Sequence, residues 1–175
     1  MNQKGKIVIL EGSEQCGKTT LARKIEDEFK AFYFHGSRPL DGDFSTYHFT
    51  MLDTALYFAE QGHTVVIDRC FISHEVYNTM FDGKPQYDTK RLYDEFVAEC
   101  ANREIPHLIV YCKPDREFNA ELREEMYDDS DGSISRKFDE VMETFGLGVS
   151  DNIIVYNWKA EPTGESIIKT IKEKK

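Results

Sequence analysis

A short apolar run, Lys6–Leu10, leads into a glycine-containing loop and then into an amphipathic segment. Four positions after the run satisfy the pattern G-x-x-x-x-G-K-[ST]: Gly12, Gly17, Lys18 and Thr19. Glycines at this spacing let the backbone curl, so that several N–H groups and the positive end of the following helix face one phosphate group. The order of strand, phosphate-binding loop and helix is that of a P-loop protein, and few folds accommodate it.

The loop predicts ATP and Mg²⁺ as cofactors. We expect Lys18 to reach the β- and γ-phosphates and the Thr19 hydroxyl to ligate Mg²⁺. The Asn-Lys-x-Asp motif with which GTPases read their base does not occur in the chain. The alternative interpretation of the glycine-containing pattern is a Gly-Lys turn before an ordinary helix. The residues expected at the ATP phosphates are Gly12, Ser13, Glu14, Gln15, Cys16, Gly17, Lys18, Thr19 and Thr20.

Apolar runs of four to six residues recur along the chain and predict strands. They are rich in β-branched residues and mostly apolar at consecutive positions, which favours a parallel sheet covered on both faces. The expected strands are Lys6–Leu10, Ala31–His35 (the weakest), His63–Asp68, His107–Cys112 and Asn152–Asn157.

Amphipathic segments of helical length lie between these runs. The alternation of strand and helix predicts an α/β fold, a three-layer α/β/α P-loop domain with a five-stranded parallel sheet. We expect one domain over residues 1–175. The expected helices are Thr19–Lys30, Phe44–Gln61, Ser73–Met80, Thr89–Arg103, Pro114–Met126, Ser135–Phe145 and Gly164–Lys174.

Charge and cysteine content exclude several classes of function. The 22 basic and 32 acidic residues give a formal net charge of −10, which makes the surface a poor general site for nucleic-acid backbone. The four cysteines form no CxxC pair and have no zinc-ligand spacing with histidine. We find no signal peptide and no apolar stretch of spanning length, and therefore expect a soluble cytoplasmic protein with no membrane partner.

A second candidate element follows the third expected strand, where Asp68 and Arg69 come directly after three apolar residues. In an open parallel sheet, ligands bind at the carboxyl ends of the strands. Asp68 is therefore a candidate for ordering Mg²⁺ or accepting a hydroxyl proton, and Arg69 for holding an anionic group. The alternative is an aspartate that caps the next helix, with Arg69 as its surface ion pair.

Two stretches together carry a resemblance to a known family. ILEGSEQCGKTTLA (Ile9–Ala22) and VVIDRCFISHEVY (Val65–Tyr77) resemble the thymidylate kinase-like group of P-loop nucleotide and nucleoside kinases, including its small bacteriophage members. The resemblance implies ATP-dependent phosphoryl transfer to a deoxynucleoside monophosphate. It departs from the pattern at Leu40–Gly42, where the family has Gly-Gly, and at Cys70, where it has an aromatic residue.

The resemblance also implies roles for single residues. Asp68 would lie near the acceptor oxygen and Mg²⁺, and Arg69 would contact the phosphate of the acceptor or the phosphate in transfer. Glu14 would face the sugar hydroxyl of the acceptor. Arg38, in a shortened version of the family's Arg-Glu-Pro segment, would bind the acceptor phosphate; the alternative is a solvated loop charge.

The resemblance also implies a helical lid, which by its position in the chain lies at about 113–135. This segment and the residue that follows it offer three arginines: Arg116, Arg123 and Arg136. Kinases of this kind close an arginine-bearing lid that excludes water from the phosphates. Of the three, we take Arg123 as the catalytic candidate. The segment also reads as an exposed helix with charge pairs four residues apart.

The sequence defines less clearly which residues would bind the adenine of ATP and the base or sugar of the acceptor. Trp158 or Lys159, after the last expected strand, are candidates for stacking on adenine. The acceptor candidates are Phe71, His74 and Tyr77, with Glu75 as a further polar contact. Aromatic residues at helical spacing more often belong to a core. The four other histidines, His35, His48, His63 and His107, are expected to have ordinary structural roles.

Three functions remain open from the sequence. The first is a deoxynucleoside monophosphate kinase, favoured because related nucleoside kinases tend to carry Glu-Arg in place of Asp-Arg. The second is a kinase that acts on a nucleoside or on a modified base in DNA, so nucleic acid is a less favoured partner. The third is a nucleotide-binding regulator without turnover. A homodimer is an open expectation, since thymidylate kinases often dimerise.

Overall fold

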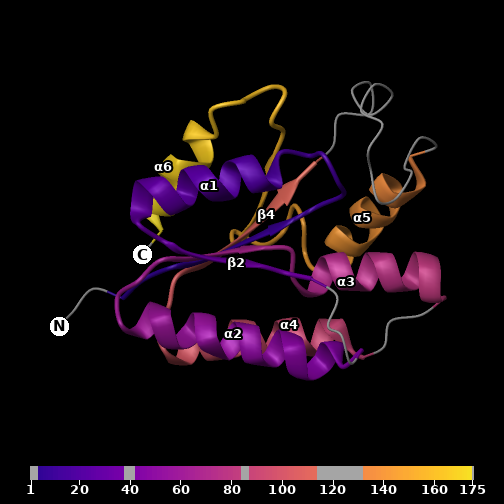
Figure 1. Ribbon diagram of the computed structural model, residues 1–175, viewed down its shortest axis with the longest axis horizontal. Helices are drawn as coiled ribbons and strands as arrows, with labels where there is room; N and C mark the ends of the chain where they lie inside the picture. The colour runs from indigo at the N-terminus through magenta and orange to yellow at the C-terminus, as the bar shows by residue number, and fades with distance from the viewer. Residues whose placement is uncertain (1–3, 38–41, 84–86, 114–131, 175) are drawn as a thin grey trace.

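A five-stranded parallel sheet in the order β2-β3-β1-β4-β5 forms the centre of the computed structural model (Figure 1). The structure describes residues 4–37, 42–83, 87–113 and 132–174. The strands are β1 (Ile7–Glu11), β2 (Phe32–His35), β3 (Val65–Asp68), β4 (His107–Cys112) and β5 (Ile153–Tyr156). The predicted α/β fold with a five-stranded parallel sheet is confirmed.

Helices cover both faces of the sheet, which gives three layers (Figure 1). Helices α1 (Lys18–Phe29) and α6 (Glu165–Glu173) lie on one face. The other face carries α2 (Phe44–Glu60), α3 (Phe71–Tyr77), α4 (Thr89–Asn102) and α5 (Ser133–Thr144). A single π-helical turn, Asn78–Asp82, continues from α3.

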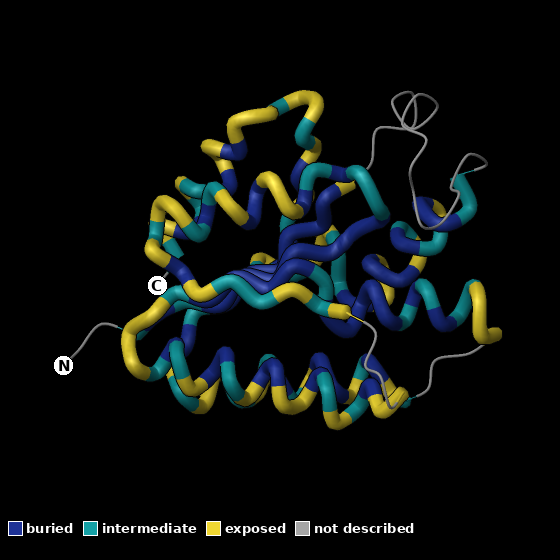
Figure 2. The backbone as a smooth tube through the Cα atoms, in the orientation of Figure 1, coloured by how far each residue is buried: buried dark blue, intermediate teal, exposed yellow. Residues whose placement is uncertain are grey.

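Burial follows the alternation of side chains along the strands. On β1, Ile7 and Ile9 point into the core beneath α2 to α5, whereas Val8 and Leu10 point into the core beneath α1 and α6. The central strands β1, β3 and β4 are buried at every position, and the outer strands β2 and β5 are partly exposed, as Figure 2 shows. The runs without alternation therefore belong to the strands with two covered faces.

Most elements begin and end within two residues of their predicted bounds, and α3 is the instructive difference. It was expected over Ser73–Met80 but begins at Phe71, because the Glu11 carboxylate accepts hydrogen bonds from the backbone N–H groups at its start. The helix predicted over Pro114–Met126 lies outside the described residues.

Phe71, a candidate acceptor contact in the sequence, lies in the core instead. Its side chain is fully buried, and its ring centroid lies 5.9 Å from the rings of both Tyr93 and Phe145. The earlier start of α3 turns this residue toward α4 and α5, which gives it a packing role.

We expect Phe71→Ala to lower the free energy of unfolding by about 3–5 kcal/mol, because the substitution leaves a cavity in the core. Chemical denaturation with guanidinium chloride measures this change. The matched control is Phe49→Ala on α2, where the phenylalanine is 44% exposed and the expected loss is below about 1 kcal/mol. Equal losses in the two variants would contradict the core placement.

Candidate functional site

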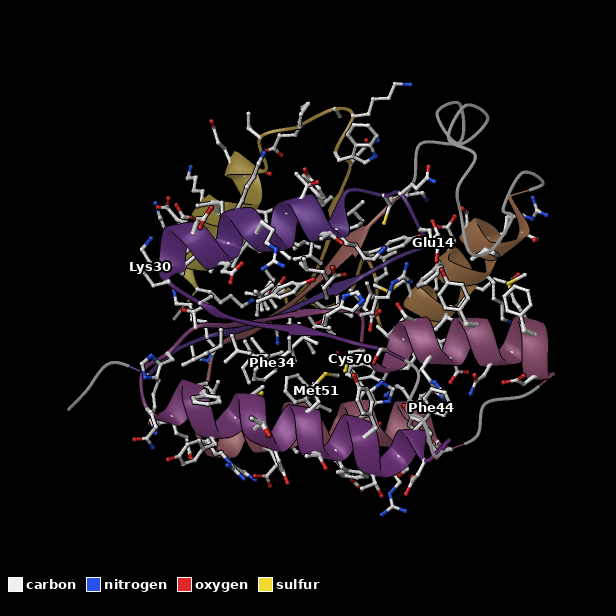
Figure 3. The ribbon with its side chains drawn as sticks, viewed as in Figure 1. Glu14, Lys30, Phe34, Phe44, Met51 and Cys70 are labelled. Atoms are coloured by element: carbon white, nitrogen blue, oxygen red, sulfur yellow. The ribbon has the colours of Figure 1, made fainter. Side chains whose placement is uncertain are left out.

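The carboxyl ends of β1, β2 and β3 meet at one edge of the sheet and bring the candidate residues together. In the strand register, Asp68 of β3 pairs with Leu10 of β1 on one side and with His35 of β2 on the other. The loop after β1 therefore opens beside Asp68. Figure 3 labels Glu14 in this loop and Cys70 at the start of α3.

The loop between β1 and α1 is packed closely enough to require its two glycines. Gly12 has a φ of +144°, and a Cβ added there would lie 2.3 Å from the carbonyl oxygen of Cys112. Gly17 has a φ of +80°, and an added Cβ would lie 2.7 Å from the Cβ of Trp158. The loop thus lies against the end of β4 and against Trp158, and any side chain at either glycine would displace it.

Lys18 is folded back into its own loop. Its side chain is buried, and its ammonium donates to the carbonyl oxygen of Ser13 and lies 3.2 Å from the Cys16 sulfur. The Cys16 thiol also donates to the Ser13 carbonyl, at 2.9 Å. Burial opposes ionisation of this thiol, but its hydrogen bond with Cys112 and the Lys18 ammonium lower its pKa. The loop therefore holds its lysine within itself, at the place where phosphate oxygens are expected.

Among the other loop residues, Gln15 adopts a left-handed conformation with a φ of +56°. Thr19 and Thr20 are exposed in the first turn of α1. The loop thereby presents two hydroxyl-bearing residues at the beginning of the helix that follows it.

Asp68 is fully buried and gathers three side chains at one of its oxygens. Its Oδ2 accepts hydrogen bonds from the Thr19 hydroxyl at 2.8 Å and the Tyr33 hydroxyl at 3.1 Å. The Nδ1 of His35 lies 3.6 Å from the same oxygen. The other oxygen, Oδ1, is buried without a hydrogen-bond partner among the described residues.

Thr19 and Asp68 have the chemistry of a Mg²⁺ site. A threonine hydroxyl and a carboxylate are hard oxygen ligands of the kind that Mg²⁺ takes in nucleotide sites. The unsatisfied Oδ1 of Asp68 leaves a buried negative charge that a cation would compensate. Thr19 and Asp68 are the residues that would hold the ion.

Arg69 joins the loop to α3. Its guanidinium donates to the Gly12 carbonyl oxygen at 3.3 Å and to the Tyr77 hydroxyl at 3.2 Å. A carboxylate oxygen of Glu14 lies 4.0 Å from the same group. Burial raises the pKa of Tyr77 to about 12, so this hydroxyl stays protonated near neutral pH. The structure thus brings together Glu14, Arg69 and Tyr77, three residues singled out in the sequence.

His74 belongs to an aromatic cluster between α2 and α3, of which Figure 3 labels Phe44. Its ring centroid lies 3.8 Å from that of Phe44 and 5.1 Å from that of Tyr87, and its Nε2 lies 2.6 Å from the Asn78 amide nitrogen. The side chain is buried by these partners. His74 accordingly lies inside this cluster, and its role as an acceptor contact stays a prediction.

The remaining candidates are placed as follows. Glu75 accepts a hydrogen bond from the Thr89 hydroxyl at the start of α4. Trp158 packs against Gly17, beside the beginning of α1. Arg136 lies in the first turn of α5. Arg38, Arg116 and Arg123 lie outside the described residues.

Sequence reasoning missed Tyr33 and His35. They are two residues apart on β2, so their side chains share the face on which Asp68 lies. The sequence does show two rings with polar tips in the second half of an apolar run. This pattern indicates a contact with Asp68 only once β2 is known to pair with β3.

Glu11 was also missed, although it ends the first apolar run. Its side chain is fully buried, and its two oxygens accept hydrogen bonds from Cys70, Ile72 and Ser73 at the start of α3. Burial raises its pKa to about 7, against the opposing effect of the hydrogen bonds from Ser73 and Ile72. A glutamate at the end of a strand buried on both faces was the available signal.

Comparison with known proteins supports the fold. The sequence matches no protein-family model and no curated protein. The structure is similar to that of YorR from Bacillus subtilis, solved in complex with phosphorylated GDP, at 22% identity and a TM-score of 0.70 over 95% of this chain and 96% of that one.

Two further solved structures show the same architecture. Thymidylate kinase from Candida albicans is 14% identical, with a TM-score of 0.55 over 97% of this chain and 93% of that one. Deoxyadenosine kinase from M. mycoides, with bound dATP, is 14% identical, with a TM-score of 0.52 over 95% and 100%. The chain therefore has the fold of the P-loop nucleotide and nucleoside kinases.

Within the part of the chain that the structure describes, no helix is both long enough and apolar enough to cross a membrane.

His48 belongs to the same aromatic cluster, with its ring centroid 5.4 Å from that of His74, and it leads to a prediction about stability at acid pH. Burial, with a smaller contribution from the charge of His74, lowers the pKa of His48 to about 3 in the folded chain. Because the unfolded chain takes up the proton near pH 6.5, this group costs stability as the pH falls from 6.5 toward 3. We expect wild type to lose about 2.5 kcal/mol more than His48→Gln between pH 7 and 4.5. Urea unfolding at a series of pH values measures the difference, and parallel losses in both chains would contradict it.

Proposed function

We propose that this protein transfers a phosphoryl group from ATP to a deoxynucleoside monophosphate. The observation that carries the proposal is the position of Arg69, whose guanidinium contacts the Gly12 carbonyl of the phosphate-binding loop and the Tyr77 hydroxyl of α3. Arg69 thus stands between the loop expected to hold ATP and the helix expected to hold the acceptor. A planar guanidinium at such a junction suits a phosphate that approaches from the acceptor side.

The roles of the residues follow from their geometry. Lys18 would exchange its contacts with Ser13 and Cys16 for the β- and γ-phosphate oxygens of ATP. Thr19 and Asp68 would hold Mg²⁺, which supplies positive charge that neutralises the transferring phosphoryl group. Asp68 would also orient the acceptor oxygen, because it lies at the same edge of the sheet as the phosphate-binding loop and Arg69.

The acceptor side would be formed by Glu14, Arg69 and Tyr77. Glu14 lies 4.0 Å from Arg69, near enough for electrostatic attraction, and its carboxylate would accept a hydrogen bond from a sugar hydroxyl of the acceptor. Positioning and electrostatic stabilisation would account for most of the rate, as in other phosphoryl transfers. Two of the structural neighbours, thymidylate kinase and deoxyadenosine kinase, are named for phosphorylation of small nucleotides or nucleosides.

The first test is a panel of acceptors: deoxynucleosides, deoxynucleoside monophosphates and oligonucleotides, each with ATP and Mg²⁺. We expect product only with monophosphates, and we expect Lys18→Ala to lower the rate at least about 100-fold while the fold stays intact. Product formation is followed by chromatography and folding by circular dichroism. Turnover with oligonucleotides alone, or no transfer to any acceptor, would overturn the proposal.

The second test concerns Arg69. In Arg69→Lys, one ammonium cannot reach both the Gly12 carbonyl and the Tyr77 hydroxyl in the fixed geometry of the guanidinium. We expect kcat/KM for the acceptor to fall about 10- to 100-fold, with the Kd for ATP nearly unchanged. Steady-state kinetics and calorimetry separate these quantities.

The matched control is Arg103→Lys, a conservative exchange at the end of α4, where Arg103 pairs with Glu99 and Glu60. This variant should keep the acceptor kinetics of wild type. A loss of ATP affinity as large as the loss in acceptor kcat/KM would place Arg69 on the ATP side and contradict its assignment.

A further inference from the structure

Glu11 lies between the phosphate-binding loop and the start of α3. It is the last residue of β1, directly before Gly12, and its side chain is fully buried. Along β1 it shares the side of Ile7 and Ile9, so it points toward α3 rather than toward the phosphate-binding loop. Its carboxylate therefore makes its hydrogen bonds at the start of α3, the helix whose Tyr77 is expected on the acceptor side.

The Glu11 carboxylate caps a helix from a distant part of the chain. Its Oε1 accepts the backbone N–H groups of Cys70 and Ile72, both at 3.1 Å. Its Oε2 accepts the backbone N–H of Ser73 at 3.0 Å and also the Ser73 hydroxyl. These N–H groups have no partners within α3, and a cap normally comes from the residue just before the helix. Here Cys70 makes no side-chain cap, and a strand 59 to 62 residues away replaces it.

This cap fixes the residue immediately before it. Arg69 has a φ of +73°, a left-handed conformation that is uncommon for a residue with a side chain. Its own N–H donates to the Leu10 carbonyl at 3.0 Å, and the next N–H, that of Cys70, donates to Glu11. Two successive residues of β1 thus hold Arg69 on both sides of its strained backbone.

We propose that Glu11 is a positioning residue of the kinase site: by capping α3 it sets where Arg69 lies relative to the phosphate-binding loop, and so controls binding of the acceptor. The inference rests on the proposed function. Without the cap, the Arg69 backbone can relax to a common conformation, and the guanidinium would leave the Gly12 carbonyl and the Tyr77 hydroxyl. The phosphate-binding loop itself keeps its own contacts with Cys112 and Trp158.

A glutamine at position 11 tests this role with little change in volume. One end of its amide is a donor and would face the Ser73 N–H, which then loses its acceptor. We expect kcat/KM for the acceptor to fall about 10- to 100-fold in Glu11→Gln, with the Kd for ATP changed by less than about threefold. Kinetics with the best monophosphate of the acceptor panel and calorimetry with ATP measure the two values.

Two further variants keep the test decisive if Glu11→Gln folds poorly. Ser73→Ala removes only the hydroxyl donor, so it should change the same acceptor parameter in the same direction by about 2- to 10-fold. Glu60→Gln, at the end of α2 and paired with Arg103, is the matched control and should behave as wild type. A double variant of Glu11 and Ser73 should lose less than the product of the single losses, because both changes break one contact.

The outcomes separate the two proposals. If wild type transfers phosphate to no acceptor, the proposed function fails. If wild type is active and folded Glu11→Gln and Ser73→Ala keep its acceptor kcat/KM, the positioning role alone fails. Equal losses in acceptor kcat/KM and in ATP affinity would also overturn it, because a general disturbance of the fold affects both ligands.

Discussion

The contact between the end of β1 and the turn after β3 is the constraint on which the rest of the site depends. Leu10 accepts the N–H of Arg69, and Glu11 accepts the N–H groups that follow it. Adjacent residues of one strand point to opposite faces of the sheet. Through this contact, the phosphate-binding loop beneath α1 and the start of α3 on the other face are held in one geometry. Asp68 and Arg69, which are neighbours in the chain, thereby contact different parts of the site: Asp68 accepts from the Thr19 hydroxyl, and Arg69 donates to the Gly12 carbonyl and the Tyr77 hydroxyl.

Much of the fold and part of the site could be predicted because the relevant signals are local. A run of consecutive apolar residues such as His107–Cys112 specifies a strand buried on both faces, and its bounds agree with the structure. The phosphate-binding loop and the Asp68–Arg69 pair are likewise short patterns at strand ends. These two patterns lie side by side because β3 is next to β1 in the sheet. The alternation of strands and helices restricts the strand order to few arrangements.

The residues that sequence reasoning missed or misplaced depend on contacts between distant segments. Tyr33 and His35 come within reach of Asp68 only because β2 pairs with β3. Glu11 caps α3 only because this helix begins beside β1. The same contact starts α3 two residues earlier than its hydrophobic pattern predicts, which directs Phe71 into the core. A pattern with helical period specifies that one face is buried, but the residue at which the helix begins decides which face this is.

The packing of Trp158 on Gly17 has a practical consequence for studies in solution. The chain has one tryptophan, and its side chain lies against the loop that wraps the expected phosphate site. An indole emits at a wavelength that depends on the polarity and charge around it, and three negative phosphates brought to this loop would alter both. If the loop binds ATP as proposed, the fluorescence of this tryptophan would follow occupancy of the loop without a label.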